Sequence, residues 1–234
     1  MRRFWDNAAL ASTPGGQQLL LDDKPMRLPE GPLIISPPAL AVAICEEWQN
    51  AGQEFNHTTD LPLTQLHTTA AYRVARDRAG IVKSIAAYGE TDLLCYRAVG
   101  PRPLRERQDQ AWQPWLDWDA LNLDAPLCVT AGVVHVPQPP SSIVALAKYV
   151  AQRSDQELAA LGVVVPATGS LVLGLAMIEG ALDAVQVHAI ATVDEAFQAE
   201  FWGSDAEAAD RDASLAAEIA LVSRYLELAR NQDV

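Results

Sequence analysis

The feature that most constrains this chain is a stretch without a charged residue, Leu158–Ile178. It is long enough for a transmembrane helix. However, Pro166 and the run Thr168-Gly169-Ser170 interrupt its middle, and we expect a first helix to end before the proline. The second part, Gly169–Ile178, is apolar on all sides, as a helix buried in a protein core is. We therefore predict two core helices rather than a membrane span.

Composition narrows the class of protein. The chain has 234 residues, half of them hydrophobic, and a formal net charge of −13. This apolar fraction excludes intrinsic disorder, and the length allows one large domain or two modest ones. The acidity argues against binding to nucleic acid or to an anionic membrane, both of which require basic surfaces. A basic protein partner, or solubility alone, fits the charge better.

Cysteine usage and the N-terminus indicate a reducing compartment. Cys45, Cys95 and Cys128 lie far apart in apolar contexts, so we expect buried free thiols rather than disulfides or zinc ligands. The N-terminus has a basic start, but Asp6 and Asn7 precede any apolar run, which argues against a secretory signal. We expect a cytoplasmic protein.

The first part of the chain is typical of β-structure followed by one helix. The turn-forming run Asp22-Asp23-Lys24 separates Gln17–Leu21 from Pro25–Leu28, which predicts a hairpin. A short strand, Leu33–Ile35, then precedes a helix over residues 36–52, with a serine cap at its start and a glycine at its end.

From residue 63 onward the pattern is mainly helical. We predict an α+β fold: a small mixed α/β N-terminal domain, residues 1–62, followed by a larger all-helical C-terminal domain, residues 63–234, with an orthogonal bundle-like arrangement. Ser154 and Glu157 form a capping box. Besides the two core helices, we expect helices around residues 66–74, 81–88, 104–118, 143–152, 183–202 and 205–229, and a β-like pair at 127–130 and 133–136.

A search for catalytic motifs finds none. The sequence has no phosphate-binding loop, dinucleotide fingerprint, nucleophile elbow or zinc-protease motif. The four histidines lack metal-ligand spacing, and His135 lies in an apolar segment, where a hydrogen-bonded core histidine is the commoner outcome. We predict no catalytic residue, metal site or cofactor, although a fold could still bring a cysteine and a histidine together.

Two helices carry conspicuous aromatic residues. Trp112, Trp115 and Trp118 follow one another at a spacing of three, so neighbouring pairs share adjacent parts of one helix. We favour a core role for them, and a binding face is the alternative.

In the helix at 190–202, Val193, Phe197 and Phe201 recur every four residues, and we expect this stripe to face the core. Asp194, Glu195 and Gln198 fall beside it. They form either a solvated face or an acidic patch that orients a basic partner.

Several segments, in order, resemble the assembly chaperones that escort the alpha subunit of the ATP synthase soluble sector. The most distinctive is SIAAYGETDLLCYRA, Ser84–Ala98. The others are AICEEW (43–48), LPLTQLHTTA (61–70), QAWQPWLDW (110–118), VTAGVVHVPQP (129–139), TGSLVLGLAM (168–177) and VDEAFQAEFWG (193–203).

This resemblance implies a function without catalysis. A free alpha subunit exposes apolar surface that will later be buried between subunits, and such surface aggregates. The implied task is to cover that surface until the beta subunit replaces the chaperone. Because no ATP-binding motif is present, release would follow from exchange of partners.

The resemblance also suggests site residues. The family's acidic position falls at Asp194 or Glu195, although Ala196 stands where relatives have a third acid. Trp48 carries over as a sensitive position through packing. Our candidate partner-binding residues are Asp194, Glu195, Gln198 and Trp202, and our candidate sensitive residues are Trp48, Asp92 and Tyr96.

The alternative function is a small-molecule binding protein or enzyme with a pocket between the two domains. A deep polar cleft near Asp92, Tyr96 and His135 would favour it. For the chaperone we expect the alpha subunit as partner, no nucleic acid, no stable membrane insertion and a monomer when free.

Overall fold

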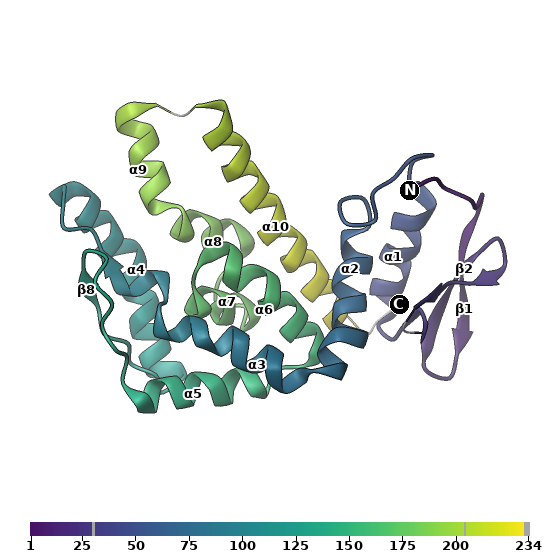
Figure 1. Cartoon of the computed structure of the whole chain (residues 1–234), viewed down its shortest axis with the longest axis horizontal. Helices are drawn as coiled ribbons and strands as arrows, with labels where there is room; N and C mark the ends of the chain where they lie inside the picture. Colours follow the sequence, from purple (N-terminus) through teal and green to yellow (C-terminus); the bar gives the residue numbers. More distant parts are fainter. Residues whose placement is uncertain (30, 204, 232–234) are drawn as a thin grey trace. The chain divides into compact units, whose positions relative to one another are not determined.

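The computed structural model describes residues 1–29, 31–203 and 205–231 (Figure 1). The chain divides into two compact units. Unit 1 comprises Met1–Arg78 together with the chain from Arg224 onward, and unit 2 comprises Ala79–Ser223. A β-sheet with helices comes first in the sequence and a largely helical part follows, which confirms the predicted fold class. The predicted domain boundary after residue 62 stays a prediction.

The sheet of unit 1 is built around β2 (Gly16–Leu21). It pairs antiparallel with β1 (Ala8–Thr13), β3 (Lys24–Pro25) and β6 (Ile34–Ile35). The predicted hairpin is present in part, because only Lys24–Pro25 of its second arm pairs with β2. Asp22 and Asp23 have φ of 47° and 61°, the left-handed pair that a tight two-residue turn requires. The strand β1 was not predicted. A separate ribbon pairs β4 (Arg27–Leu28) with β5 (Gly31–Pro32).

Helix α1 (Pro38–Asn50) packs against β1 and β2, and its Leu40, Ile44 and Trp48 are buried. Its N-cap is Pro37 rather than the predicted serine, and no side chain caps it. The helix also ends before the predicted Gly52, at Asn50. Prolines at its first turn supply the fixed φ that starts a helix, so a side-chain cap is not needed there.

The chain continues through α2 (Pro62–Thr68) into a π-helical turn, η1 (Thr69–Val74). Leu66, Ala70 and Val74 are buried, so this predicted helix face is confirmed.

The remaining elements are mainly helices. They are α3 (Arg78–Ala86), the 3-10 turns η2 (Ala87–Glu90) and η3 (Leu93–Cys95), β7 (Tyr96–Arg97), α4 (Arg102–Asn122), β8 (Thr130–Ala131), α5 (Pro140–Ala151), α6 (Asp155–Thr168), α7 (Leu171–Ile178), α8 (Ala184–Ala191), α9 (Val193–Trp202) and α10 (Ala206–Arg230).

Helix α7 forms the core of unit 2, with every residue buried. A Cβ at Gly174 would lie 2.7 Å from a Val165 methyl, so α6 and α7 pack closely. Contrary to prediction, α6 continues through Pro166. The carbonyl that the proline leaves without a donor belongs to Gly162, and both residues are exposed, so water can satisfy it. Among the described residues no helix has the length and apolar character to cross a membrane.

Three other predictions are wrong. The β-like pair at 127–136 is absent; instead β8 pairs parallel with β7, and Val133 is 96% exposed. The helix predicted over 183–202 breaks at Thr192 into α8 and α9. Cys128 is exposed and Cys45 half-buried, whereas Cys95 is buried as expected. Apolar neighbours in sequence did not become neighbours in a core, because the loop around β8 runs over the surface.

Candidate partner-binding site

The Asp92 carboxylate is enclosed at the start of α7. One oxygen accepts hydrogen bonds from the Leu94 N–H at 3.0 Å and the Ser170 Oγ at 2.8 Å, and the other accepts from the Val172 N–H at 3.0 Å. Full burial raises the pKa of Asp92 to about 6, against the opposing effect of these bonds. The negative charge also faces the positive end of the helix dipole. Asp92 therefore holds the turn after α3 onto α7.

Asp119, in α4, was missed by the sequence analysis. It is fully buried, and within the described ranges neither carboxylate oxygen has a hydrogen-bond partner. Burial, and secondarily the charge of Asp92, raise the pKa of Asp119 to about 8. It is therefore mainly protonated at neutral pH. A lone polar residue in a helix gave no sequence signal that its side chain turns inward.

Gln108 of α4 joins two of the segments on which the resemblance was based. Its Oε1 accepts from the Ala98 N–H at 2.6 Å, and its Nε2 donates to Asp194 at 2.7 Å. Gln108 itself is buried, and Asp194 is half-buried in the first turn of α9. The predicted residue Asp194 is thus engaged inside the protein, and its carboxylate fixes where α9 begins relative to α4.

Further contacts hold α9 against α4. Arg107 forms two hydrogen bonds to Glu200, at 2.7 and 2.6 Å, and its guanidinium lies 5.2 Å from the centre of the Phe197 ring. The Trp112 Nε1 donates at 2.9 Å to the carbonyl of Ile190, which lies in the preceding helix α8. Together with the Gln108 bridge, these contacts place α9 firmly along one side of α4 (Figure 1).

The outward side of α9 is exposed. Glu195, Gln198 and Trp202 lie at helical spacing on it, with Phe201 beside them. Trp202 is 77% exposed and Phe201 is 62% exposed. Phe201 was predicted to face the core; α9 extends beyond what covers Phe197, so its last aromatic residues reach solvent. We call these four residues the α9 face.

The three tryptophans of α4 are mainly packing residues. Trp112 is buried beneath the guanidinium of Arg97, which lies 5.2 Å from the ring centre. Trp115 and Trp118 are half-buried and lie against each other, 6.3 Å between ring centres. The preferred core interpretation holds for Trp112 and only partly for the other two.

Asp92, Tyr96 and His135 do not share a cleft. Asp92 is fully buried, whereas His135 is exposed rather than the core histidine we predicted. Its Nδ1 lies 3.5 Å from the hydroxyl of half-buried Tyr96, at the limit of a hydrogen bond. The short strand β8 ends before His135, so its side chain is not carried inward.

Trp48 belongs to unit 1. It is buried against the rings of Trp5 and Phe55, and its Nε1 donates to the Thr64 hydroxyl at 3.1 Å. The neighbouring Glu47 carboxylate accepts the Leu63 and Thr64 N–H groups at 2.7 and 3.0 Å, so it caps the start of α2. These contacts pack Trp48 into unit 1, and its sensitivity to substitution stays a prediction.

Comparison with known proteins decides the family. The sequence model described as ATP12 chaperone protein matches residues 2–120. The crystal structure of Atp12 from Paracoccus denitrificans superposes with a TM-score of 0.90, at 41% identity over 98% of each chain. The chain belongs to the ATP12 chaperone family.

Two further structures agree. An aspartate-to-lysine mutant of the Paracoccus protein matches at 40% identity over 98% of each chain, with a TM-score of 0.90. The Atu1473 protein of Agrobacterium tumefaciens matches at 33% identity, over 99% of this chain and 86% of that one, with a TM-score of 0.88. ATP12 proteins are non-enzymatic assembly factors for the ATP synthase, so this chain is a chaperone and not an enzyme, as the sequence predicted.

Proposed function

We propose that this ATP12 family member binds the free alpha subunit of the ATP synthase and covers its subunit interface until the beta subunit takes its place. The observation that carries this proposal is the α9 face. Two adjacent large aromatic side chains stand in solvent on a helix that is held firmly at its other end. Tryptophan and other aromatics dominate the energetics of protein interfaces, and clustered exposed apolar side chains mark such surfaces.

The candidate residues take different parts in this proposal. Glu195, Gln198 and Trp202 are exposed and would touch the alpha subunit directly. Asp194 would act as a positioning residue, because its carboxylate accepts the Gln108 amide and is not free to face a partner. Trp48, Asp92 and Tyr96 would matter through folding and packing.

A second apolar surface supports the proposal. Val99 and Val133 are 79% and 96% exposed, and neighbouring Val134 is 70% exposed. The Gly132 N–H donates to the carbonyl of Arg97 at 2.8 Å, so the two valine segments are held beside each other. A chaperone that shields apolar surface needs apolar surface of its own, and these valines add to the exposed apolar surface of unit 2.

The mode of binding follows from these properties. Exposed aromatics provide affinity, while the negative charge of the chain steers a basic partner surface during encounter. No nucleotide chemistry is needed if the beta subunit displaces the chaperone by competing for the same surface. We also propose a cytoplasmic monomer that neither inserts into membranes nor binds nucleic acid.

The test is binding to the purified alpha subunit of the same organism, measured with W202A and with F4A as its control. Phe4 is also a strongly exposed aromatic, at 74%, but lies in unit 1. We expect W202A to weaken binding at least about tenfold, as loss of an interface hot spot does, and F4A to leave binding unchanged. Equal binding by wild type and W202A would exclude the α9 face, and no complex with the folded wild type at micromolar concentration would overturn the function.

A charge-reversal test addresses Glu195, the acidic residue of the α9 face. E195K should reduce the association rate, and E46K, at an exposed position of α1 in unit 1, should not. Thermal unfolding of both variants should match that of the wild type. If E195K instead lowers the unfolding temperature strongly, Glu195 is structural and does not contact the partner.

A further inference from the structure

The first half of α10 lies outside the packed core. In residues 206–218 no side chain is fully buried, and only Ala208, Leu215 and Ala216 are half-buried, whereas Ile219 and Val222 further along are buried. The stretch is rich in alanine, which favours a helix even where little packs against it. Small side chains also leave unfilled the space that larger ones would occupy.

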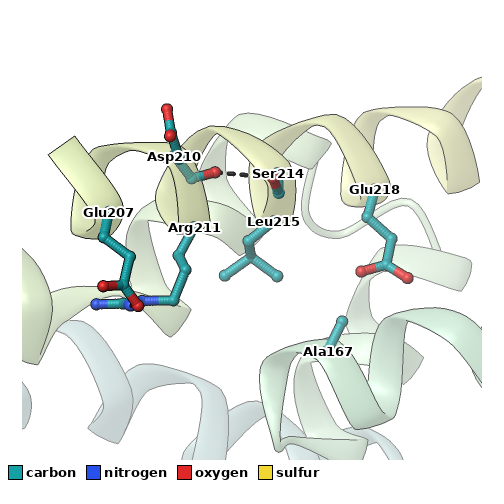
Figure 2. Close-up of a pocket in the computed structure, with 7 residues that line it drawn as sticks. All are labelled: Ala167, Glu207, Asp210, Arg211, Ser214, Leu215 and Glu218. Atoms are coloured by element: carbon teal, nitrogen blue, oxygen red, sulfur yellow. Dashed lines mark hydrogen bonds and ion pairs between the residues drawn. The ribbon is translucent and has the colours of Figure 1, made fainter.

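This space is a groove between α10 and α6 with a volume of about 390 Å³ (Figure 2). Leu215 points from α10 toward α6, and Ala167 of α6 lies opposite. The groove is lined by Ala167, Glu207, Asp210, Arg211, Ser214, Leu215 and Glu218. All of them belong to unit 2, so the groove is formed within one compact body.

The acidic residues of the groove are not equivalent. Glu207 forms an ion pair with Arg211, which neutralises that end. The Asp210 carboxylate points away from Ala167, and the backbone carbonyl of Asp210 accepts a hydrogen bond from the Ser214 hydroxyl at 2.7 Å (Figure 2). The Glu218 side chain points toward Ala167, and in the described part of the chain it forms no ion pair. The Glu218 carboxylate therefore faces the groove, next to Leu215.

A further contact of α10 lies outside the groove. The His188 Nε2 of α8 lies 3.0 Å from a carboxylate oxygen of Asp212, which is not among the lining residues. Glu207 follows Trp202 closely in sequence, and the last turn of α9 and the first turn of α10 lie at the same end of unit 2 (Figure 1). A partner that contacts the α9 face can therefore reach the groove.

We propose that this groove binds a segment of the alpha subunit in which a lysine or arginine lies beside an aliphatic side chain. The inference rests on the proposed function and deepens it. The aliphatic side chain would fill the space between Leu215 and Ala167, and the cation would pair with Glu218. The net charge of −13 favours the approach of such a segment over an acidic one.

Two matched pairs of variants test the groove with the purified alpha subunit as probe. A167W fills the space, and A213W places the same side chain at an exposed position of α10 outside the lining. E218K reverses the charge that faces the groove, and D212K makes the same change at an exposed position of the same helix outside the lining. We expect A167W and E218K each to weaken binding about tenfold, and both controls to stay within about twofold of the wild type.

The outcomes separate this inference from the function. If the wild type and all four variants bind the alpha subunit equally, the groove is not used while the chaperone function stands. If A167W misfolds by circular dichroism, the pair E218K and D212K still decides. Equal loss in E218K and D212K would overturn the groove and indicate a general charge effect.

A second probe does not depend on the alpha subunit. A short peptide of lysine and leucine should shift the methyl resonances of Leu215 and Ala167 in a nuclear magnetic resonance titration, and the same peptide with glutamate for lysine should not. If the wild type fails to bind the alpha subunit, a selective shift with the lysine peptide would still support the groove chemistry. No shift, or equal shifts with both peptides, would overturn it.

Discussion

Asp92 and Asp194 both belong to segments that resemble the chaperone family, and both lie at the start of a helix. Their roles in the structure nevertheless differ. Asp92 is fully buried and accepts three hydrogen bonds from groups around the beginning of α7. Asp194 is half-buried and accepts one side-chain bond, from Gln108. The first carboxylate organises the core of unit 2, and the second sets the position of an exposed helix. Two motifs that are equally distinctive in the sequence can thus have different roles: one stabilises the core, and the other positions an exposed helix.

The largest effect should follow removal of the core carboxylate. D92A leaves the Leu94 and Val172 N–H groups and the Ser170 hydroxyl buried without an acceptor. We expect a loss of about 3–5 kcal/mol in the free energy of unfolding, because each buried unsatisfied group costs about 1–3 kcal/mol. Chemical denaturation measures this directly. A loss no greater than that of D194A would erase the contrast between the two aspartates.

A second prediction concerns Asp119, which lies close enough to Asp92 to feel its charge. D119N should raise the free energy of unfolding at pH 7 by about 2–3 kcal/mol, because an amide carries no proton-dependent burial penalty.

The effect should depend on pH with a definite sign. Burial raises the pKa of Asp119 to about 8 in the folded state, whereas the unfolded pKa is near 4. Below pH 4 the carboxyl is neutral in both states and the fold carries no penalty. As the pH rises from 4 to 8, the unfolded state loses its proton first, so the free energy of unfolding falls. The advantage of D119N over wild type should therefore grow between pH 4 and pH 8 and then level off. A constant difference across this range would show that Asp119 does not titrate in the fold.

A smaller loss is expected for the positioning carboxylate. D194A removes the acceptor for the buried Gln108 amide and should cost about 1–2 kcal/mol, the value of a charge-assisted hydrogen bond that is partly solvated. It should also weaken binding of the alpha subunit, because α9 loses part of its attachment to α4. D194N, which can still accept the bond, should recover most of both. Failure of D194N to recover binding would make the charge itself, rather than the position of α9, the important property.

The smallest effect on stability should come from the α9 face. W202A removes a side chain that is 77% exposed, so the free energy of unfolding should change by less than about 0.5 kcal/mol. Binding of the alpha subunit is nevertheless expected to suffer most in this variant. A large fall in the unfolding temperature of W202A would show that this tryptophan packs in the folded protein, and the two regions would no longer differ in kind.

Much of the fold and part of the site could be predicted locally. The division of Leu158–Ile178 into two helices follows from Gly169, which ends α6 in a left-handed conformation with φ of 68°, and from Ser170, which caps α7. The Ser154–Glu157 capping box forms as predicted. These signals act within a few residues, so the chain alone specifies them.

The sequence by itself determined the helical core and the family, because apolar periodicity, caps and collinear segments are properties of the chain. Only the tertiary structure decided which polar groups turn inward and which apolar ones turn outward. Gln108 joins Ala98 to Asp194 across long sequence separations, and Phe201 is exposed because α9 continues past its cover. Helical periodicity predicts which side chains share one face of a helix, but what packs against that face depends on where the neighbouring helices end.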